Sequence, residues 1–528
     1  MIFFSILILI VAIALPSFNK QVSPILFTRI SSIIFLYAGA LNFNALYIQS
    51  IGSGIGIYSG LFHVTIISQF LEVFLLIIGS LILISSTYNP NAHLQYTTPA
   101  VGAINYATYS LVVLFSTLGA SLLVSSYDLI SMYLSIELQS FGVYILATLY
   151  RNSESATSAG LKYFLLGGLS SCIILLGASL IYTYTGLTNF ESIYSLISVS
   201  AYGAVNINDI IIGLSLGLIL VISGFLFKIA AAPLHYWAPD VYDDSPTIVT
   251  IWLTIMPKIS ILVLLLEVIG NISPYLHLNI MGADSVNIGT IKILLLISSL
   301  LSLIIGTVVG LAQTKIKRLL AYSTISHIGF ILLALVINTE QSTESLIFYI
   351  IQYSLTNLNT FLIIIALGYI IMPSIINNYG IKNNADINYI TELKGQFFSN
   401  PILSLSLSVC LFSMAGIPPL IGFFAKQFVL YSAIQNGYYF ISIVAILVSV
   451  ISASYYLKII KILHTEGDNI ETELNASPTD ASLSQHLILS HVHSFSISTL
   501  TLTIILFVLK PSIILNSTQL LSLYLYNF

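Results

Sequence analysis

Apolar runs of about 20 residues, long enough to cross a bilayer as a helix, recur from one end of this chain to the other. Of its 528 residues, 57% are hydrophobic and 7% are charged, whereas soluble proteins carry about 25% charged residues. No polar stretch is long enough to form a separate soluble domain. Because a spanning segment must satisfy its own backbone groups, runs of this length predict an all-α integral membrane protein.

Segmentation at polar and turn residues gives about 14 transmembrane helices. The net charge of -4 is small and dispersed, so we expect no nucleic-acid partner. The beginning of the chain lacks basic residues, and we expect it to be a retained first span. The predicted spans are 2–18, 28–49, 59–87, 108–126, 128–149, 158–184, 209–238, 246–270, 289–311, 319–337, 345–372, 401–434, 437–463 and 487–509.

Basic residues of the connecting loops sort onto one face of this arrangement. By the positive-inside rule, that face is the cytoplasm or the mitochondrial matrix, and both termini lie on the opposite, intermembrane-space side. The polar stretch 464–486 predicts a solvated loop on the basic face. The residues that sort in this way are Lys20 and Arg29, Arg151, Lys315, Lys317 and Arg318, Lys382 and Lys394, and Lys458 and Lys461.

Neither the glycine-rich stretch nor the cysteines of this chain predict a cofactor or metal site. The glycines of 52–56 lack the spacing and strand–helix context of a nucleotide loop, so they predict a turn between helices. Only Cys172 and Cys410 are cysteines, and both lie in apolar segments. They supply neither a disulfide framework nor a ligand set for an iron–sulfur cluster.

The stretch 224–247 places a lysine, Lys228, inside an apolar run that Pro233 interrupts five residues later. A charge in hydrocarbon costs at least about 2.5 kcal/mol, so it indicates a functional role. A proline frees backbone groups that a neighbour must satisfy. Both features within one crossing are typical of the interrupted helices of transport proteins.

A second interrupted crossing occurs at 415–428, where Pro418 and Pro419 precede Lys426. Interrupted segments at corresponding places in two halves indicate an inverted repeat. With five spans in each copy, spans 4–8 and 9–13 form the repeats, and spans seven and twelve are the discontinuous ones. The predicted units are 1–100 (three helices), 101–272 (first repeat), 273–463 (second repeat), 464–486 (loop) and 487–528 (last helix and interfacial tail).

Four charged residues fall at similar depth on four different predicted helices: Glu137, Lys228, Lys258 and Lys426. A lysine at the midplane has the longest reach to water, whereas one near a helix end extends to the surface. We expect that surface position for Lys162 and Lys292. An amine that loses water is easier to deprotonate, and a nearby carboxylate reverses this effect. The four charges therefore predict a proton path.

Three further residues are secondary candidates for the proton path. His235 follows the first interruption of the chain. His327 fits either a packing histidine or a proton relay, since imidazole titrates near neutral pH. Glu72, deep in span three, fits either a protonated, hydrogen-bonded carboxyl or a part of the path.

Five segments together resemble the antiporter-like membrane subunits of the mitochondrial proton-pumping NADH:ubiquinone oxidoreductase, respiratory complex I. The resemblance covers about 100–480, and the Glu-Leu-Gln-Ser sequence that begins at Glu137 is most similar to the subunit 2 branch. The segments are 135–147, 158–171, 227–247, 315–330 and 415–428.

The resemblance implies an antiporter-like fold with two inverted five-helix repeats and discontinuous helices seven and twelve. It implies that Glu137 pairs with Lys228, that Lys258 is the central carrier, and that Lys426 stands toward the exit. Flavin, iron–sulfur clusters and the quinone site are expected in other subunits, so this chain holds no cofactor. Its implied partners are other membrane-arm subunits, including sister antiporter-like subunits, and lipids of the mitochondrial inner membrane.

Two other functions are also compatible with the sequence. A stand-alone cation/proton antiporter would share this fold and its lysines. A structural scaffold of the membrane arm would keep the charges without using them.

Overall fold

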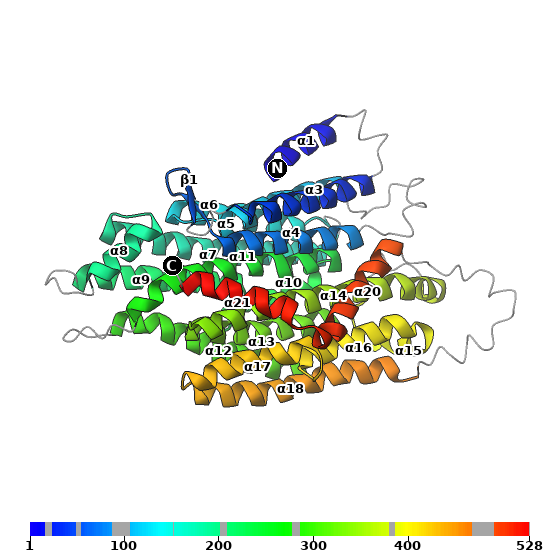
Figure 1. Ribbon diagram of the computed structural model, residues 1–528. Coiled ribbons are helices and arrows are strands. Elements are labelled where there is room, and N and C mark those ends of the chain that lie inside the picture. Colours follow the sequence, from blue (N-terminus) through cyan, green and yellow to red (C-terminus); the bar gives the residue numbers. More distant parts are fainter. Residues whose placement is uncertain are drawn as a thin grey trace, which may run out of the picture.

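The computed structural model describes residues 1–15, 24–48, 54–86, 106–150, 153–200, 208–276, 286–379, 386–466 and 490–526. Most of these residues are helical, and the long helices lie side by side with roughly parallel axes (Figure 1). The helices are α1 (Ile2–Ala14), α3 (Pro24–Ala45), α4 (Ile66–Ser86), α5 (Tyr106–Val124), α6 (Leu129–Ala147), α7 (Glu154–Thr185), α8 (Phe190–Ser200), α9 (Asn208–Lys228), α10 (Trp237–Asp244), α11 (Thr247–Leu276), α12 (Val286–Leu311), α13 (Ile316–Ile337), α14 (Glu340–Tyr379), η3 (Ile390–Leu393), α15 (Gln396–Ser399), α16 (Pro401–Ala415), α17 (Ile421–Gln435), α18 (Tyr439–His464), α20 (His491–Leu506), η4 (Phe507–Leu509) and α21 (Ser512–Tyr526).

Within the described residues, 11 helices are long and apolar enough to cross a membrane. Three shorter apolar helices, Ile2–Ala14, Ile212–Lys228 and Pro401–Ala415, occupy the predicted spans one, seven and twelve. The last two end where the chain is interrupted, at Lys228 and at Ala415. The helical membrane architecture with two discontinuous helices is therefore confirmed, while the count of 14 crossings stays a prediction.

Two sets of five spans pack in the same order. In the first set, α5 packs against α6, α6 against α7 and α7 against α9, and α11 returns to α5. In the second set, α12 packs against α13, α13 against α14 and α14 against α16 and α17, and α18 returns to α12. The shared order of contacts agrees with the two predicted five-helix repeats.

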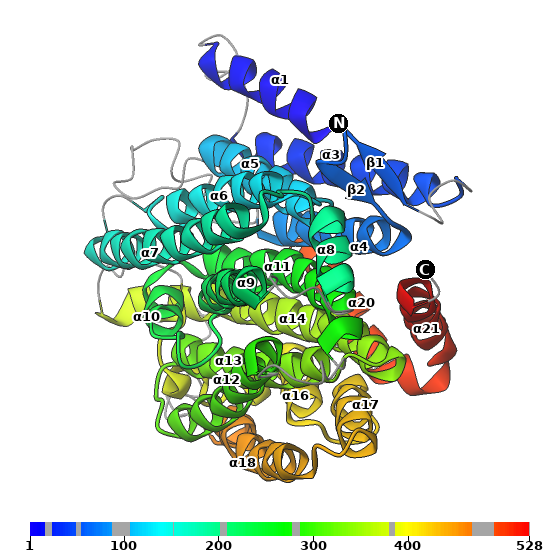
Figure 2. The ribbon, with the colours of Figure 1, turned by 90° about the vertical axis from the view of Figure 1, so that its left-hand side faces the viewer.

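Helices α11 and α13 lie in the middle of the bundle (Figure 2), and each is 94% buried along its apolar window. By contrast, α18 at the edge of the bundle is only 33% buried. A polar residue on α11 or α13 is therefore shielded from the surroundings, and any partner it has lies inside the protein. These two helices carry Lys258 and His327.

A small β-hairpin separates α3 from α4, which corrects the predicted start of span three at residue 59. Strands β1 (Ile55–Ile57) and β2 (Phe62–Val64) pair antiparallel, with Ile55 opposite Val64. The hairpin turn contains three residues in the left-handed region, Tyr58, Ser59 and Gly60. Because the hairpin takes up residues 55–64, α4 begins only at Ile66.

The C-terminal tail forms α21, which packs against α14 and α4. Both cysteines are free, with Cys410 buried and Cys172 exposed. Most of the predicted loop at 464–486 lies outside the described residues, as do Lys20, Arg151 and Lys382.

Candidate functional site

The first interruption of the chain lies between α9, which ends at Lys228, and α10, which begins at Trp237. The backbone turns at Ala230, whose φ is +61°, and the amide of Ala231 donates to the Leu226 carbonyl at 2.9 Å. The indole Nε1 of Trp237 donates to the Phe227 carbonyl at 2.9 Å. The Phe227 carbonyl also accepts from the amide of Ala230 at 3.0 Å, so the indole is its second donor and links the two halves of the interrupted helix.

The predicted contact between Glu137 and Lys228 is present. Lys228 Nζ lies 3.2 Å from Glu137 Oε1, and their side chains are 7% and 14% exposed. The ammonium also donates to Ser140 Oγ at 3.3 Å. Since Lys228 is the last residue of α9, the partial negative charge of that helix end further stabilises its ammonium.

The second interruption lies between α16 and α17 and holds a lysine in a comparable way. The chain turns at Gly416, whose φ is +86°, and the amide of Gly422 donates to Ser413 Oγ at 3.2 Å. Lys426 Nζ donates to the carbonyl of Ala415, the last residue of α16, at 2.9 Å. Each interruption therefore presents the C-terminal end of a half-helix to a buried ammonium.

Lys258 lies between these two sites on α11, and its residue is 2% exposed. Its Nζ has no hydrogen-bond partner among the described residues. Two tyrosine rings flank it instead, with centroids 5.6 Å away for Tyr242 and 5.9 Å away for Tyr353. Cation–π contact at these distances attracts an ammonium, but it does not fix the charge as a carboxylate would.

His327 on α13 shares the neighbour Tyr353 with Lys258. Its Nδ1 lies 2.7 Å from the hydroxyl of Tyr349 and its Nε2 lies 3.3 Å from that of Tyr456. Both lysines are close enough to act electrostatically on the imidazole. A tyrosine hydroxyl both donates and accepts, so this geometry serves a satisfied packing histidine and a relay equally well.

Aromatic rings fill the spaces between these charged groups. From Lys228 toward Lys258, the rings of Phe227, Trp237 and Tyr242 follow one another at centroid distances of 6.2 and 5.9 Å. Beyond Lys258, the ring of Tyr353 lies 5.7 Å from that of His327. Lys426 Nζ stands 5.6 Å from the centroid of Phe330. We name Glu137, Lys228, Lys258, His327 and Lys426 the buried row.

The remaining candidates have other neighbours than the buried row. His235, in the interruption between α9 and α10, stacks on Tyr236. Glu72 has Asn42 of α3 as its side-chain hydrogen-bond partner. Within the described part of the chain, neither residue forms a direct hydrogen bond with a member of the buried row. Lys162, predicted to reach the surface, is 53% exposed and lies 3.4 Å from Asp240.

The structure also identifies residues that the sequence analysis did not select. Tyr242, Tyr349, Tyr353 and Tyr456 line the buried row, but nothing in the sequence separates them from the other tyrosines, of which the chain has 32 in all. Asp386 is a carboxylate in the loop before η3, and its partners are distant in sequence.

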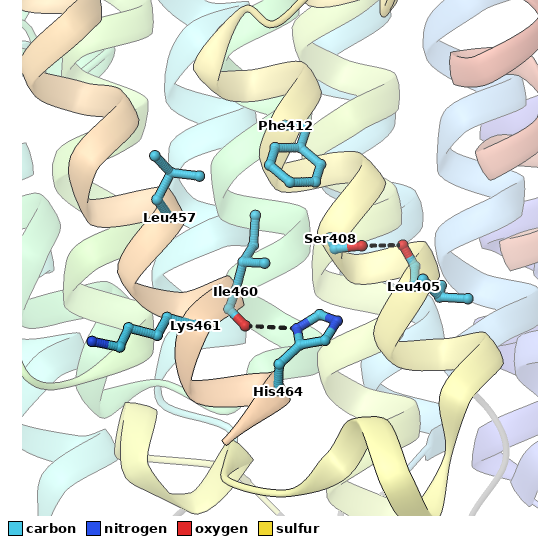
Figure 3. A pocket seen from close by; sticks show the side chains of 7 residues that line it. All are labelled: Leu405, Ser408, Phe412, Leu457, Ile460, Lys461 and His464. Carbon is cyan, nitrogen blue, oxygen red and sulfur yellow. Dashed lines mark hydrogen bonds between the residues drawn. The ribbon is translucent and has the colours of Figure 1, made fainter. Parts of the chain in front are cut away.

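A groove between α16 and α18 lies apart from the buried row. Figure 3 shows its apolar lining, which includes Leu405, Phe412 and Leu457, with Lys461 and His464 at the end of α18. The imidazole Nδ1 of His464 is 2.9 Å from the Ile460 carbonyl. No member of the buried row lines this groove.

Comparisons with known proteins agree with this geometry. Residues 126–452 match the family described as "NADH:quinone oxidoreductase/Mrp antiporter, TM". The chain is 49% identical to NADH-ubiquinone oxidoreductase chain 2 of Rhizopus oryzae, and the alignment covers 100% of both chains. It is 34% identical to NADH-quinone oxidoreductase subunit N of Pelagibacter ubique over 83% of this chain and 84% of that protein.

Solved structures share the architecture along almost the whole chain. A chain of respiratory complex I from Thermus thermophilus with bound aureothin superposes with a TM-score of 0.70 at 25% identity, covering 98% of this chain and 99% of that one. A chain of the Mrp complex from Dietzia has a TM-score of 0.71 at 19% identity, covering 98% and 96%, and it shares the fold. The match over residues 126–452 and the full-length relative show that this chain belongs to the family of NADH:quinone oxidoreductase and Mrp antiporter membrane subunits.

Proposed function

We propose that this chain conducts protons across the mitochondrial inner membrane as a membrane-arm subunit of respiratory complex I. Its relatives over most or all of their length are named as chain 2 or subunit N of NADH oxidoreductases. NADH oxidation and ubiquinone reduction take place in other subunits, which hold the flavin, the iron–sulfur clusters and the quinone site. Proton movement in this chain is coupled to that chemistry.

The observation that carries the proposal is the buried ion pair of Glu137 and Lys228 beside an interrupted helix. In the proposed path, opening this pair lets Lys228 pass its proton toward Lys258. Lys258 is the central carrier, because among the described residues two tyrosine rings flank its ammonium and no hydrogen-bond acceptor holds it. Lys426 receives the proton on the exit side, with His327 between the two lysines.

The energies involved are of the right size for such a path. Two unit charges 4 Å apart attract by about 4 kcal/mol at an effective dielectric constant near 20. Moving one charge across 100 mV costs about 2.3 kcal/mol. Opening or closing one buried ion pair can therefore drive the transfer of a proton against the membrane potential.

The proposal predicts that Lys228→Ala lowers both proton pumping and the coupled reduction of quinone in the assembled complex. The matched control is Lys461→Ala, which removes an exposed lysine from the groove of Figure 3 and leaves pumping unchanged. The measurement is the number of protons pumped per NADH oxidised in sealed membrane vesicles. An unchanged ratio in the Lys228 variant would refute the assigned role.

A stand-alone cation/proton antiporter is the second candidate, because the matching family also includes Mrp antiporters. Isolation separates the two functions. Purification of the chain without partner subunits, together with exchange of sodium for protons in liposomes, would establish the antiporter and exclude the complex I role.

The proposed setting completes this assignment. The basic face lies in the matrix, both termini lie on the intermembrane-space side, and other membrane-arm subunits and lipids cover the apolar surface. The proposed units are 1–100, 101–272, 273–463, 464–486 and 487–528.

A further inference from the structure

The first turn of α11 is capped by a carboxylate from the second repeat. Asp386 accepts a hydrogen bond from the backbone amide of Thr247, the first residue of α11, at 3.0 Å. It accepts a second one from the hydroxyl of the same threonine. The first amides of a helix lack partners within the helix, and a neighbouring residue in sequence usually supplies one. Here the cap comes from a residue 139 positions later.

Lys317 completes this contact at the start of α13. Its Nζ donates to Asp386 Oδ2 at 2.7 Å and to the carbonyl of Ser245 at 2.9 Å. Ser245 directly follows α10, and Lys317 is only 3% exposed. One ammonium therefore joins the end of α10, the start of α11, the start of α13 and the loop before η3. We name Thr247, Lys317 and Asp386 the clasp.

The loop that carries Asp386 is itself fixed to the second repeat. The amide of Ile316 donates to the Asn388 carbonyl at 3.0 Å, and the amide of Ile390 donates to the Thr314 carbonyl at 3.1 Å. These bonds form an antiparallel bridge between Lys315 and Tyr389. The chain two residues after Asp386 is therefore bonded to the turn between α12 and α13.

The charge state of the clasp is stable at neutral pH. Burial raises the pKa of the Asp386 carboxyl, but the ammonium of Lys317 and the two hydrogen bonds from Thr247 outweigh burial and lower that pKa below its ordinary value. Asp386 is therefore ionised near pH 7, and it neutralises Lys317. The clasp is a fixed connection and does not itself exchange protons.

The clasp lies at the end of α10 and the start of α11, the two helices that carry Tyr242 and Lys258. Tyr242 is on α10, three residues before Ser245, and Lys258 is on α11, 11 residues after Thr247. Eleven residues of helix are about three turns, so a shift or rotation at Thr247 is transmitted along α11 to Lys258. The clasp thus fixes both the helix that carries Lys258 and the helix that carries its aromatic neighbour.

We infer that Asp386, Lys317 and Thr247 are positioning residues for proton transfer: they hold Lys258 at its working distance from the Glu137–Lys228 pair by tying α11 to the second repeat. This inference rests on the proposed function and adds to it, since none of the three residues belongs to the buried row. It also gives the second repeat a means of acting on the first.

The test compares proton pumping with electron transfer in the assembled complex. Asp386→Asn keeps the size of the side chain and removes its charge, and we expect the rate of NADH-driven proton pumping to fall about tenfold, because small misplacements of reacting groups slow the transfer step. Asp386→Glu restores the carboxylate and should recover most of the pumping. The matched control, Glu466→Gln, removes an exposed carboxylate after the end of α18 and leaves pumping unchanged.

A double-mutant cycle asks whether the clasp acts as one unit. If it does, Lys317→Gln combined with Asp386→Asn pumps no worse than either single variant, because each removes the same contact. Additive losses would overturn the inference, as would normal pumping in Asp386→Asn. If Asp386→Asn fails to assemble, Thr247→Val decides the question, since it removes only the hydroxyl contact: lowered pumping supports the clasp and normal pumping rejects it.

The clasp and the proposed function can fail separately. Loss of pumping in Lys228→Ala with normal pumping in the clasp variants would reject the clasp alone. Normal pumping in Lys228→Ala would reject the proposed path whatever the clasp variants do.

Discussion

Lys258 is the most enclosed lysine of the buried row, at 2% exposure against 8% for Lys228 and 7% for Lys426. Each of the other two has a partner that holds its ammonium, a carboxylate for Lys228 and a helix-end carbonyl for Lys426. A buried charge without such a partner is expensive. Among the described residues no hydrogen-bond acceptor holds the ammonium of Lys258, which suits a central carrier that must release its proton.

Two replacements of Lys258 test its role as a carrier, one by removing the charge and one by making it permanent. Lys258→Met places a neutral side chain of similar length there, and Lys258→Arg places a cation that does not deprotonate in proteins. Because a carrier needs both charge states, we expect each variant to abolish proton pumping in sealed vesicles. Removal of the buried charge should leave the amount of assembled complex unchanged in Lys258→Met. Normal pumping by Lys258→Arg would contradict a carrier role.

At the scale of elements, the two interruptions turn one long helix into two half-helices whose ends face lysines. The geometry of the second interruption depends on Gly416, because a φ of +86° is strained for any residue with a Cβ. A Cβ built on Gly416 would also lie 3.0 Å from Lys426 Cδ. Backbone conformation and lysine position are therefore linked at this residue.

Gly416→Ala and Gly437→Ala separate backbone strain from contact with the lysine. Gly437 also has a positive φ, +81°, but a Cβ there meets nothing within 4 Å. Both variants should lose about 1 kcal/mol of stability through backbone strain. Only Gly416→Ala should also lower proton pumping, because its methyl group displaces Lys426. Equal pumping by the two variants would exclude a positional role for this interruption.

At the scale of the whole molecule, an ion-pair cluster joins the two repeats at the ends of α10 and α13. Arg318 Nη2 lies 2.7 Å from Asp240, and Arg318 Nε lies 3.1 Å from Asp243. Lys315 lies 2.7 Å from Asp243, whose side chain is only 3% exposed. No pattern in the sequence predicted a contact between the acidic end of α10 and the basic start of α13, and the fold brings the two together beside the clasp.

Loss of Arg318 should loosen the join between the repeats. Arg318→Gln is expected to cost about 1 to 2 kcal/mol of stability, because it leaves the buried Asp243 with one cation fewer. The cost is not larger because the Arg318 side chain is partly exposed and water screens its charge. Lys162→Gln breaks a more exposed pair with Asp240 and should cost less than about 1 kcal/mol. The measurement is the temperature at which membranes lose quinone reductase activity. A larger loss in Lys162→Gln would contradict this ranking.

Much of this architecture could be predicted from the sequence because its causes are local. A run of about 20 apolar residues has few options other than a spanning helix. Pro233 and the pair Pro418 and Pro419 mark interruptions wherever the surrounding helices lie. The pairing of Glu137 with Lys228 was predictable through the resemblance to antiporter-like membrane subunits, because a charge in hydrocarbon needs a partner but three lysines could provide it.

The clasp and the tyrosines of the buried row could not be predicted in this way. Asp386 and Thr247 are 139 residues apart, and no pattern along the chain marks one as the partner of the other. In the sequence, Tyr349 and Tyr353 look like any other aromatic residues of an apolar helix. Their contact with His327 exists only because α14 packs against α13. The hairpin before α4 was missed because its strands are only three residues long.

The sequence by itself determined that long apolar helices form, where two of them are interrupted and that Lys228, Lys258 and Lys426 are buried, because each of these depends on the cost of moving nearby groups out of water. Only the tertiary structure decided the aromatic neighbours of Lys258, the place of His327 between two lysines and the carboxylate that caps α11. Those contacts depend on how distant helices pack, and packing is set by the shape of the whole bundle rather than by any one stretch of the chain.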